Sequence, residues 1–225
     1  MFSGKAFVLK SVRLIFTKKG RAKFVSHLDM NRLMIRLIRK SRLDIWYTEG
    51  FNPHPYITFA LPLPLGFESN YEIMDIRVMD DDYDISVIPE KLNAVCPEYI
   101  RFEKAVEPVK KVGSIAFASY DILFDDNGEM LDDINAFLSK PSILAQKKTK
   151  KGDFKTIDLA QKLKKYEVSE SGGNTLLKII LPAGSEDNVN PSLLLEAFYG
   201  ENAERYYCFN VTRNDIFDAN LNRFS

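Results

Sequence analysis

The sequence has few of the side chains that carry out most enzyme chemistry. It contains two histidines and two cysteines, and Cys96 and Cys208 are too far apart to match a metal-binding or redox spacing. The motifs GxGxxG, GxSxG and the P-loop are absent. Without a third cysteine, the chain cannot by itself ligate an iron–sulfur cluster through cysteines. These absences predict a cytoplasmic protein in a reducing environment, with no metal and no cofactor of its own.

Long hydrophobic runs are also missing. The N-terminal residues 1–16 are interrupted by lysines, so they resemble neither a signal peptide nor a membrane span. The chain is 45% hydrophobic and 28% charged, which is ordinary for a globular protein. We therefore expect no membrane partner.

The net charge is zero, yet the charges are unevenly spread. Between Lys10 and Arg42 the only acidic residue is Asp29. The same stretch holds eleven basic residues, namely Lys10, Arg13, Lys18, Lys19, Arg21, Lys23, Arg32, Arg36, Arg39, Lys40 and Arg42. Such asymmetry is informative about partners, whereas the overall charge is not.

Hydrophobic periodicity divides the chain into two similar halves. In the first half, strands are predicted at 11–18, 56–60, 71–79 and 99–106, with helices at 27–41 and 86–95. Ser26 and Asp29 form an S-x-x-D variant of the capping box before the first helix. The resulting order, β-α-β-β-α-β, is the ferredoxin-like pattern.

The second half repeats this order with an insertion. Strands are predicted at 118–125, 142–148, 175–183 and 205–213, with helices at 130–139 and 190–200. Residues 148–165 are rich in lysine and predict an extra hairpin and a short helical turn. We expect an α+β fold of tandem ferredoxin-like repeats with antiparallel sheets, in domains 1–110 and 111–225, joined near residues 107–117.

Both histidines lie in unusual contexts in the first half. His27 follows the helix-capping Ser26, and His54 stands between two prolines in the segment GFNPHP, residues 50–55. The prolines restrict the backbone there to extended geometry. We expect His27, His54, Asn52 and Asp29 to converge on one cleft, where an imidazole pair and a carboxylate are candidates for general acid–base catalysis or for binding a divalent metal ion. The alternative is purely structural: Ser26 caps, Asp29 favours the positive helix end, and the imidazoles bond to the backbone.

A second candidate is the helix face that carries Arg32, Arg36 and Arg39. These arginines share one stripe, opposite the apolar stripe of Met30, Leu33 and Leu37. Together with Lys18, Lys19, Arg21 and Lys23 on the preceding turn, they predict a surface that binds phosphate groups or nucleic acid. The alternative is an ordinary solvated helix face, against which the shortage of acidic partners argues.

The stretch from residue 12 to residue 78 resembles a family of bacterial radical SAM-linked proteins, a domain of unknown function. The signature residues of this resemblance are Phe24, Ser26, His27, Leu28, Asp29, Arg32, the segment Gly50 to Pro55 with Phe51, Asn52 and His54, the segment Leu63 to Gly66, Glu72 and Asp75.

The resemblance implies a partner protein, because members are encoded beside, or fused behind, a radical S-adenosylmethionine enzyme. Their gene context implies RNA or ribosome modification. The function expected is therefore an accessory or substrate-presenting protein that binds RNA and is not itself catalytic. The alternative is a metal-independent endoribonuclease that uses His27 or His54, as in the RAMP-type CRISPR RNA-processing enzymes, to which the tandem layout is similar only in architecture.

Overall fold

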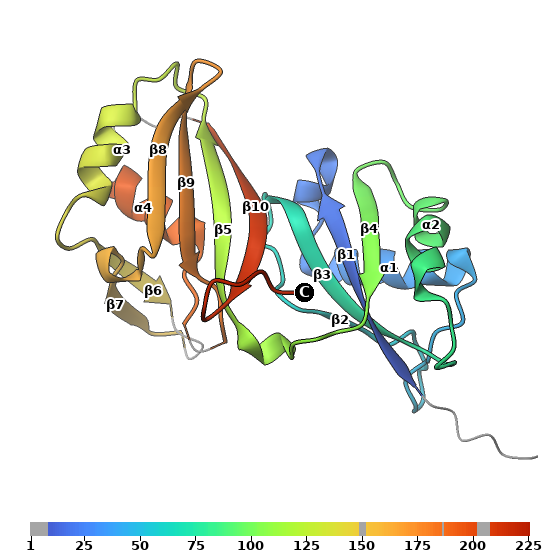
Figure 1. Cartoon of the computed structure of the whole chain (residues 1–225). Coiled ribbons are helices and arrows are strands. Elements are labelled where there is room, and N and C mark those ends of the chain that lie inside the picture. Colours follow the sequence, from blue (N-terminus) through green and yellow to red (C-terminus); the bar gives the residue numbers. More distant parts are fainter. Residues whose placement is uncertain (1–8, 149–151, 186, 202–207) are drawn as a thin grey trace, which may run out of the picture. The chain divides into compact units, whose positions relative to one another are not determined.

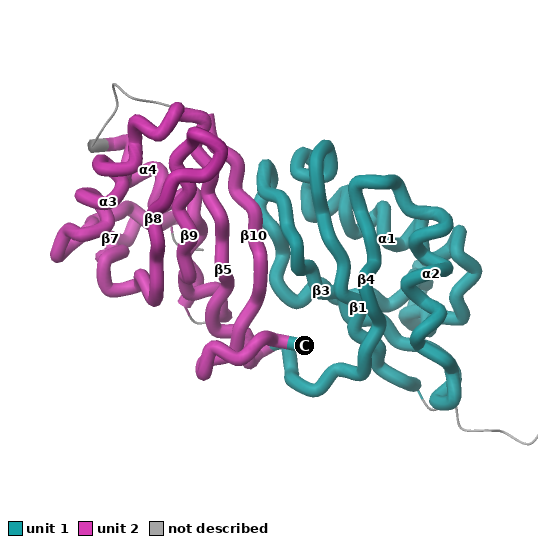
Figure 2. Tube along the Cα trace, turned by 45° about the horizontal axis from the view of Figure 1, so that its top comes forward, with its two compact units in different colours: residues 1–112, 225 teal, residues 113–224 magenta. Residues whose placement is uncertain are grey.

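The computed structural model describes residues 9–148, 152–185, 187–201 and 208–225. The chain divides into two compact units, one of residues 1–112 with Ser225 and one of residues 113–224 (Figure 2). None of the helices within these ranges is long and apolar enough to cross a membrane.

Unit 1 contains an antiparallel sheet whose strands stand in the order β4-β1-β3-β2. Its elements are β1 (Lys10–Lys18), the 3-10 helix η1 (Gly20–Phe24), α1 (His27–Ser41), β2 (Ile57–Phe59), β3 (Glu68–Val78), η2 (Ile85–Val87), α2 (Ile88–Asn93) and β4 (Ile100–Val106) (Figure 1). The predicted helices and strands of this half all exist, although several boundaries move by one to three residues, and the second helix is limited to 88–93.

The core of unit 1 lies between the sheet and its two helices. On β1 the side chains of Val12, Leu14 and Phe16 alternate towards this core, and Met74, Ile76 and Val78 do so on β3. The helices contribute the buried residues Met30, Met34, Leu37, Ile38, Ile88 and Leu92. The two helices therefore cover one face of this sheet, and the buried side chains of α1 hold this helix against it.

Helix α1 begins and packs as its sequence predicts. The side chain of Ser26 accepts a hydrogen bond from the backbone N–H of Asp29 at 3.1 Å and donates one to the Asp29 carboxylate at 2.7 Å. Arg42, at φ +54°, ends the helix in the left-handed conformation. The predicted apolar stripe is buried, except that Leu33 is only partly so.

Unit 2 has a sheet in the order β10-β5-β9-β8 and a separate hairpin, β6-β7. Its elements are η3 (Val112–Ser114), β5 (Ile115–Phe124), α3 (Leu131–Leu138), β6 (Leu144–Lys148), β7 (Phe154–Asp158), η4 (Ala160–Lys162), β8 (Lys165–Ser171), β9 (Asn174–Pro182), α4 (Pro191–Glu201) and β10 (Phe209–Asp218) (Figure 1). Residues 205–207 of the predicted last strand lie outside the described residues.

The insertion in unit 2 contains the predicted extra hairpin, β6-β7, and the predicted short helical turn, η4, but the strand pairing around it differs from the expected order. The strand expected at 142–148 exists as β6, but it pairs with β7 rather than with β9. The partner of β9 is β8, which is joined to it by a turn at Gly172 and Gly173. The sequence of β8, KYEVSES, lacks a regular apolar alternation because this strand lies at the sheet edge and has few buried side chains. That is why the periodicity did not reveal it.

Candidate functional site

The predicted arginine stripe lies on the exposed face of α1. Arg32, Arg36 and Arg39 are all exposed, on the opposite side of the helix from the buried stripe. The rise of 1.5 Å per residue spreads them over about 10 Å. Leu28, one turn before Arg32, is on the same face and is 60% exposed. The N-terminal end of this face is therefore apolar and the remainder is basic.

Only Arg32 on this face has an acidic partner. Its Nη1 lies 3.2 Å from Asp29 Oδ1, one turn back on the helix, so the expectation that the stripe lacks acidic neighbours is wrong at this position. The guanidinium groups of Arg36 and Arg39 form no ion pair or hydrogen bond with any residue that the structure describes. Two guanidinium groups are thus available to bind an anion.

The basic residues before α1 are divided between the surface and the interior. Arg21 is exposed, Lys19 lies 4.0 Å from Glu68, and the ammonium of Lys23 lies 5.3 Å from the ring centroid of Phe24. Lys18 is only 4% exposed, and its Nζ donates to the carbonyl of Val25 at 3.2 Å. Lys18 therefore does not belong to the predicted phosphate-binding surface.

Several large apolar side chains near the start of α1 are open to solvent. Phe24 is 69% exposed and Leu65 is 63% exposed. The backbone N–H of Gly66 donates to the carbonyl of Lys23 at 2.7 Å, which brings the loop that carries Leu65 to the residue before Phe24. These two side chains and Leu28 are functional candidates that the site prediction from sequence missed. Solvent exposure is a property of the fold, so periodicity alone gave no signal for them.

His27 borders a small recess that holds two buried charged residues. The recess is lined by Phe16, Lys18, His27, Met30, Phe59, Pro62, Leu63 and Glu72. Its volume is about 10 Å³, which is roughly the room that one water molecule needs. The His27 ring meets the Phe59 ring edge-to-face, with 5.2 Å between centroids. Lys18 and Glu72, each 4% exposed, bring opposite charges to its wall.

The sequence does contain a signal for this recess. Lys18 follows Leu14 and Phe16 in the alternation of β1, and Glu72 precedes Met74 and Ile76 in that of β3. A charged residue at an inward-facing strand position predicts a buried polar site.

His54 lies on a different structure, the loop between Tyr47 and Pro55, which face each other in an isolated antiparallel bridge. The backbone N–H of Thr48 donates to the His54 carbonyl at 2.9 Å, and the N–H of His54 donates to Thr48 Oγ1 at 3.3 Å. The imidazole Nδ1 is 3.1 Å from the Asn52 carbonyl. Since a carbonyl only accepts, we assign the imidazole proton to Nδ1, which leaves Nε2 as an acceptor.

The two histidines do not form a pair. His27 contacts Phe59, which lies opposite Met74 on β3, whereas the loop of His54 joins the sheet where Ile45 faces Val78. The recess therefore lies beside the middle of β3, whereas the loop joins the sheet at the Val78 end of this strand, and the four residues from Met74 to Val78 span about 13 Å. Asp29 bonds with Ser26 and Arg32, not with either imidazole. The structure does not bring the four residues into the single cleft that the sequence suggested.

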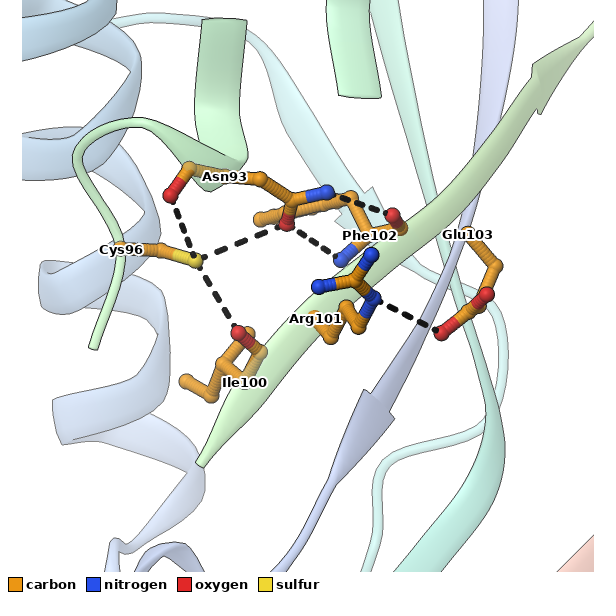
Figure 3. A network of polar contacts seen from close by, with 6 residues as sticks. All are labelled: Asn93, Cys96, Ile100, Arg101, Phe102 and Glu103. Atoms are coloured by element: carbon orange, nitrogen blue, oxygen red, sulfur yellow. Dashed lines mark hydrogen bonds and ion pairs between the residues drawn. The ribbon is translucent and has the colours of Figure 1, made fainter. Parts of the chain in front are cut away.

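A larger cavity, about 660 Å³, lies between α2 and β4 of unit 1. On its wall, the Asn93 amide donates to the carbonyl of Phe102 at 2.8 Å and accepts from its N–H at 2.9 Å (Figure 3). Cys96 Sγ lies 3.0 Å from the Ile100 carbonyl. Burial raises the pKa of the Cys96 thiol, which disfavours the reactive thiolate. Cys96 does not line the cavity, whose wall carries charges of both signs from Glu90, Arg101, Glu103 and Lys104.

Other parts of the described chain add little to a site. No group of three or more His, Cys, Asp or Glu side chains suited to a metal ion occurs in the ranges that the structure describes. The lysine-rich tip of the unit 2 insertion, residues 149–151, lies outside them. Lys147 and Lys155 face each other across β6 and β7, and Lys155 is exposed.

Comparison with known proteins identifies a family and distantly similar structures. Residues 11–191 match the family described as "Uncharacterized protein conserved in bacteria (DUF2344)". No curated protein matches. A crystal structure of an unknown protein from Galdieria sulphuraria is similar at 11% sequence identity and a TM-score of 0.27, covering 92% of this chain and 99% of that chain.

Proposed function

Because the chain belongs to this family of uncharacterised bacterial proteins, we propose a function from the site itself: unit 1 binds RNA and is not itself catalytic. The observation that carries the proposal is the exposed face of α1. There Arg36 and Arg39 have no acidic partner among the described residues, and the apolar Leu28 and Phe24 are open at the start of the helix. Guanidinium groups bind phosphates, and exposed aromatic rings stack on unpaired bases.

The buried Lys18 is consistent with binding rather than catalysis. Its ammonium is held by the Val25 carbonyl, in the turn that leads into α1, so it fixes the direction in which the arginine face points. The recess beside it has room for about one water molecule, which is too small for a nucleotide.

We further propose that both units are ferredoxin-like repeats. In unit 1 the strands follow the order β4-β1-β3-β2, and in unit 2 the order β10-β5-β9-β8. With β6 and β7 set aside as an insertion, each order reads fourth, first, third and second strand of a β-α-β-β-α-β unit.

The partner would be a radical SAM enzyme, to which the present chain delivers or holds an RNA substrate. The first support is the resemblance of residues 12–78 to the radical SAM-linked proteins. The second is that the chain has two cysteines, so the cysteine ligands of an iron–sulfur cluster would belong to another protein.

The endoribonuclease alternative rests on His54, whose Nε2 makes no hydrogen bond with any described residue. An imidazole with a free nitrogen on an exposed loop can act as a general base. Incubation of structured RNA with the wild-type protein and with His54→Ala and His27→Ala distinguishes the two functions. Cleavage that one of these variants loses would replace the binding function by the nuclease.

The test of RNA binding compares two charge reversals in the full chain. Arg36→Glu removes one phosphate contact and adds repulsion, so we expect at least a tenfold loss of affinity for a labelled single-stranded RNA in fluorescence anisotropy. Lys155→Glu makes the same change in charge on β7 of unit 2 and should leave the affinity within about twofold. Equal effects of the two variants, or no binding by the wild type at low salt, would overturn the proposal.

A further inference from the structure

One loop of unit 1 presents an aromatic ring entirely to solvent. Phe51 is 104% exposed, more than any other large hydrophobic residue that the structure describes. It sits at the tip of the loop between Tyr47 and Pro55, next to Gly50, whose φ of +119° suits glycine. A fully exposed phenyl ring lacks the roughly 2 kcal/mol or more of stabilisation that its burial would give. The stability of the fold therefore does not explain the position of Phe51.

The loop is held rigidly at its base. The N–H of Thr48 donates to the His54 carbonyl, and the N–H of His54 donates to Thr48 Oγ1. The imidazole Nδ1 of His54 bonds the Asn52 carbonyl near the loop tip. Below them the Arg77 guanidinium lies 4.4 Å from the ring centroid of Tyr56 and 5.4 Å from that of Trp46. Pro53 and Pro55 remove further backbone freedom. A rigid loop loses little entropy when it binds, so its tip is pre-organised for recognition.

The polar groups beside Phe51 match the edge of a nucleobase. The Asn52 amide makes no hydrogen bond with any described residue, and His54 Nε2 is an open acceptor. Glu49 is the one charged residue in 48–54, and its negative charge disfavours a phosphate at the tip. An aromatic ring with an amide and an imidazole, and without a cation, is suited to stack on an unpaired base and to hydrogen-bond its edge.

We propose that the loop 47–55 is a nucleobase-recognition loop, in which Phe51 stacks on an unpaired base and Asn52 and His54 bond its edge. This inference rests on the proposed RNA binding and adds a second contact of different chemistry. The arginine face of α1 contacts phosphates, so its contribution to RNA affinity decreases as the salt concentration rises. The loop contacts a base, so its contribution does not depend on salt.

The experiment measures RNA affinity of the full chain against salt concentration for several variants. Phe51→Ala should weaken binding of a single-stranded oligonucleotide about tenfold at every salt concentration, without changing the slope of log affinity against log salt. Phe51→Trp should retain the affinity and show fluorescence quenching by the stacked base, over the background from Trp46 measured in the wild type. Phe154→Ala, at an exposed phenylalanine on β7, is the matched control and should have no effect.

The outcomes separate the two proposals. If Arg36→Glu weakens binding but Phe51→Ala does not, the recognition loop is refuted and RNA binding stands; Phe51 would then belong to a protein-docking surface. If Phe51→Ala weakens binding to an abasic oligonucleotide as much as to an intact one, stacking on a base is also refuted. If the wild type binds no RNA, both proposals fail.

Discussion

At the scale of single residues, unit 1 keeps unusually many charges in its interior. Arg13 is 1% exposed and makes a two-pronged ion pair with Asp75, with Nε to Oδ1 and Nη2 to Oδ2 both at 2.8 Å. Lys18 and Glu72 are buried at the recess beside His27. A buried charge is costly unless an opposite charge or hydrogen bonds compensate it, so the Arg13–Asp75 pair favours the register of β1 against β3 in which these two residues lie opposite each other.

Substitution of Lys18 and Glu72 tests whether they compensate each other. Lys18→Met and Glu72→Met each leave the opposite charge in an apolar recess, so each should lower the free energy of unfolding by about 3 kcal/mol. The double variant should lose less than the sum of the two. Urea unfolding of the three variants measures the coupling; strict additivity would show that the two charges are compensated by other groups.

Unit 2 buries the charged residues Asp126 and Arg213, of which Asp126 organises the turn before α3. Its carboxylate accepts from Thr175 Oγ1 at 2.6 Å, from the N–H of Thr175 at 2.8 Å and from the N–H of Met130 at 2.7 Å. Burial raises the pKa of Asp126, but these hydrogen bonds outweigh burial and hold the pKa below its ordinary value of 3.8. The carboxylate therefore stabilises the folded state fully above that ordinary value.

The pH dependence of stability follows from this direction. As the pH falls below 3.8 towards the lowered pKa of the folded state, the contribution of Asp126 is lost. Asp126→Asn should lower the free energy of unfolding by about 2 kcal/mol at pH 7, and the difference from wild type should shrink below pH 4. Chemical denaturation from pH 7 to pH 3 gives the comparison. A difference that stays constant over this range would contradict the assignment.

At the scale of elements, the edge strand β4 shows how one side chain can protect a sheet. The Asn93 amide bonds both backbone groups of Phe102 (Figure 3), in the manner of a neighbouring strand. The charged Arg101 and Glu103 flank this position, and their side chains lie 3.8 Å apart. Such features discourage pairing of the edge with another chain.

Removal of this amide should therefore have two effects. Asn93→Ala leaves the partly buried Phe102 groups without their partner and should destabilise the protein by about 2 kcal/mol. It also opens the edge, so self-association should increase in light scattering at high protein concentration. Asn135→Ala is a suitable control, because Asn135 donates only within its own helix, to the Leu131 carbonyl. Equal behaviour of the two variants would refute the protective role.

The elements also show why part of the structure was predictable. Helix α1 follows from its periodic stripe and the Ser26 cap, both of which are local in sequence. The prediction missed β8 because its side chains are mostly exposed. It assigned β6 to the main sheet, whereas β6 pairs with β7, the next strand along the chain. The relative placement of His27 and His54 depends on the register of β2 against β3, which periodicity does not determine. Phe51 is a signature residue of the resemblance, but its full exposure is a property of the fold.

At the scale of the whole molecule, a net charge of zero conceals a local basic surface. The eleven basic residues between Lys10 and Arg42 are not equivalent: Arg13 and Lys18 are buried, while Arg36 and Arg39 are exposed without an acidic partner in the described part of the chain. The central claim is that this exposed part of α1 binds the phosphates of RNA.

The salt dependence of RNA affinity tests this claim most directly. Arg36 and Arg39 have no acidic partner among the described residues, and two such contacts that each displace a counterion from a single strand predict a slope of about −1.4 for log affinity against log salt. Replacement of Arg36 by glutamine should reduce the magnitude of this slope by roughly 0.7. The predicted result is a slope of about −1.4 in the wild type and a slope of smaller magnitude in Arg36→Gln. An affinity independent of salt, or a slope that Arg36→Gln leaves unchanged, would contradict it.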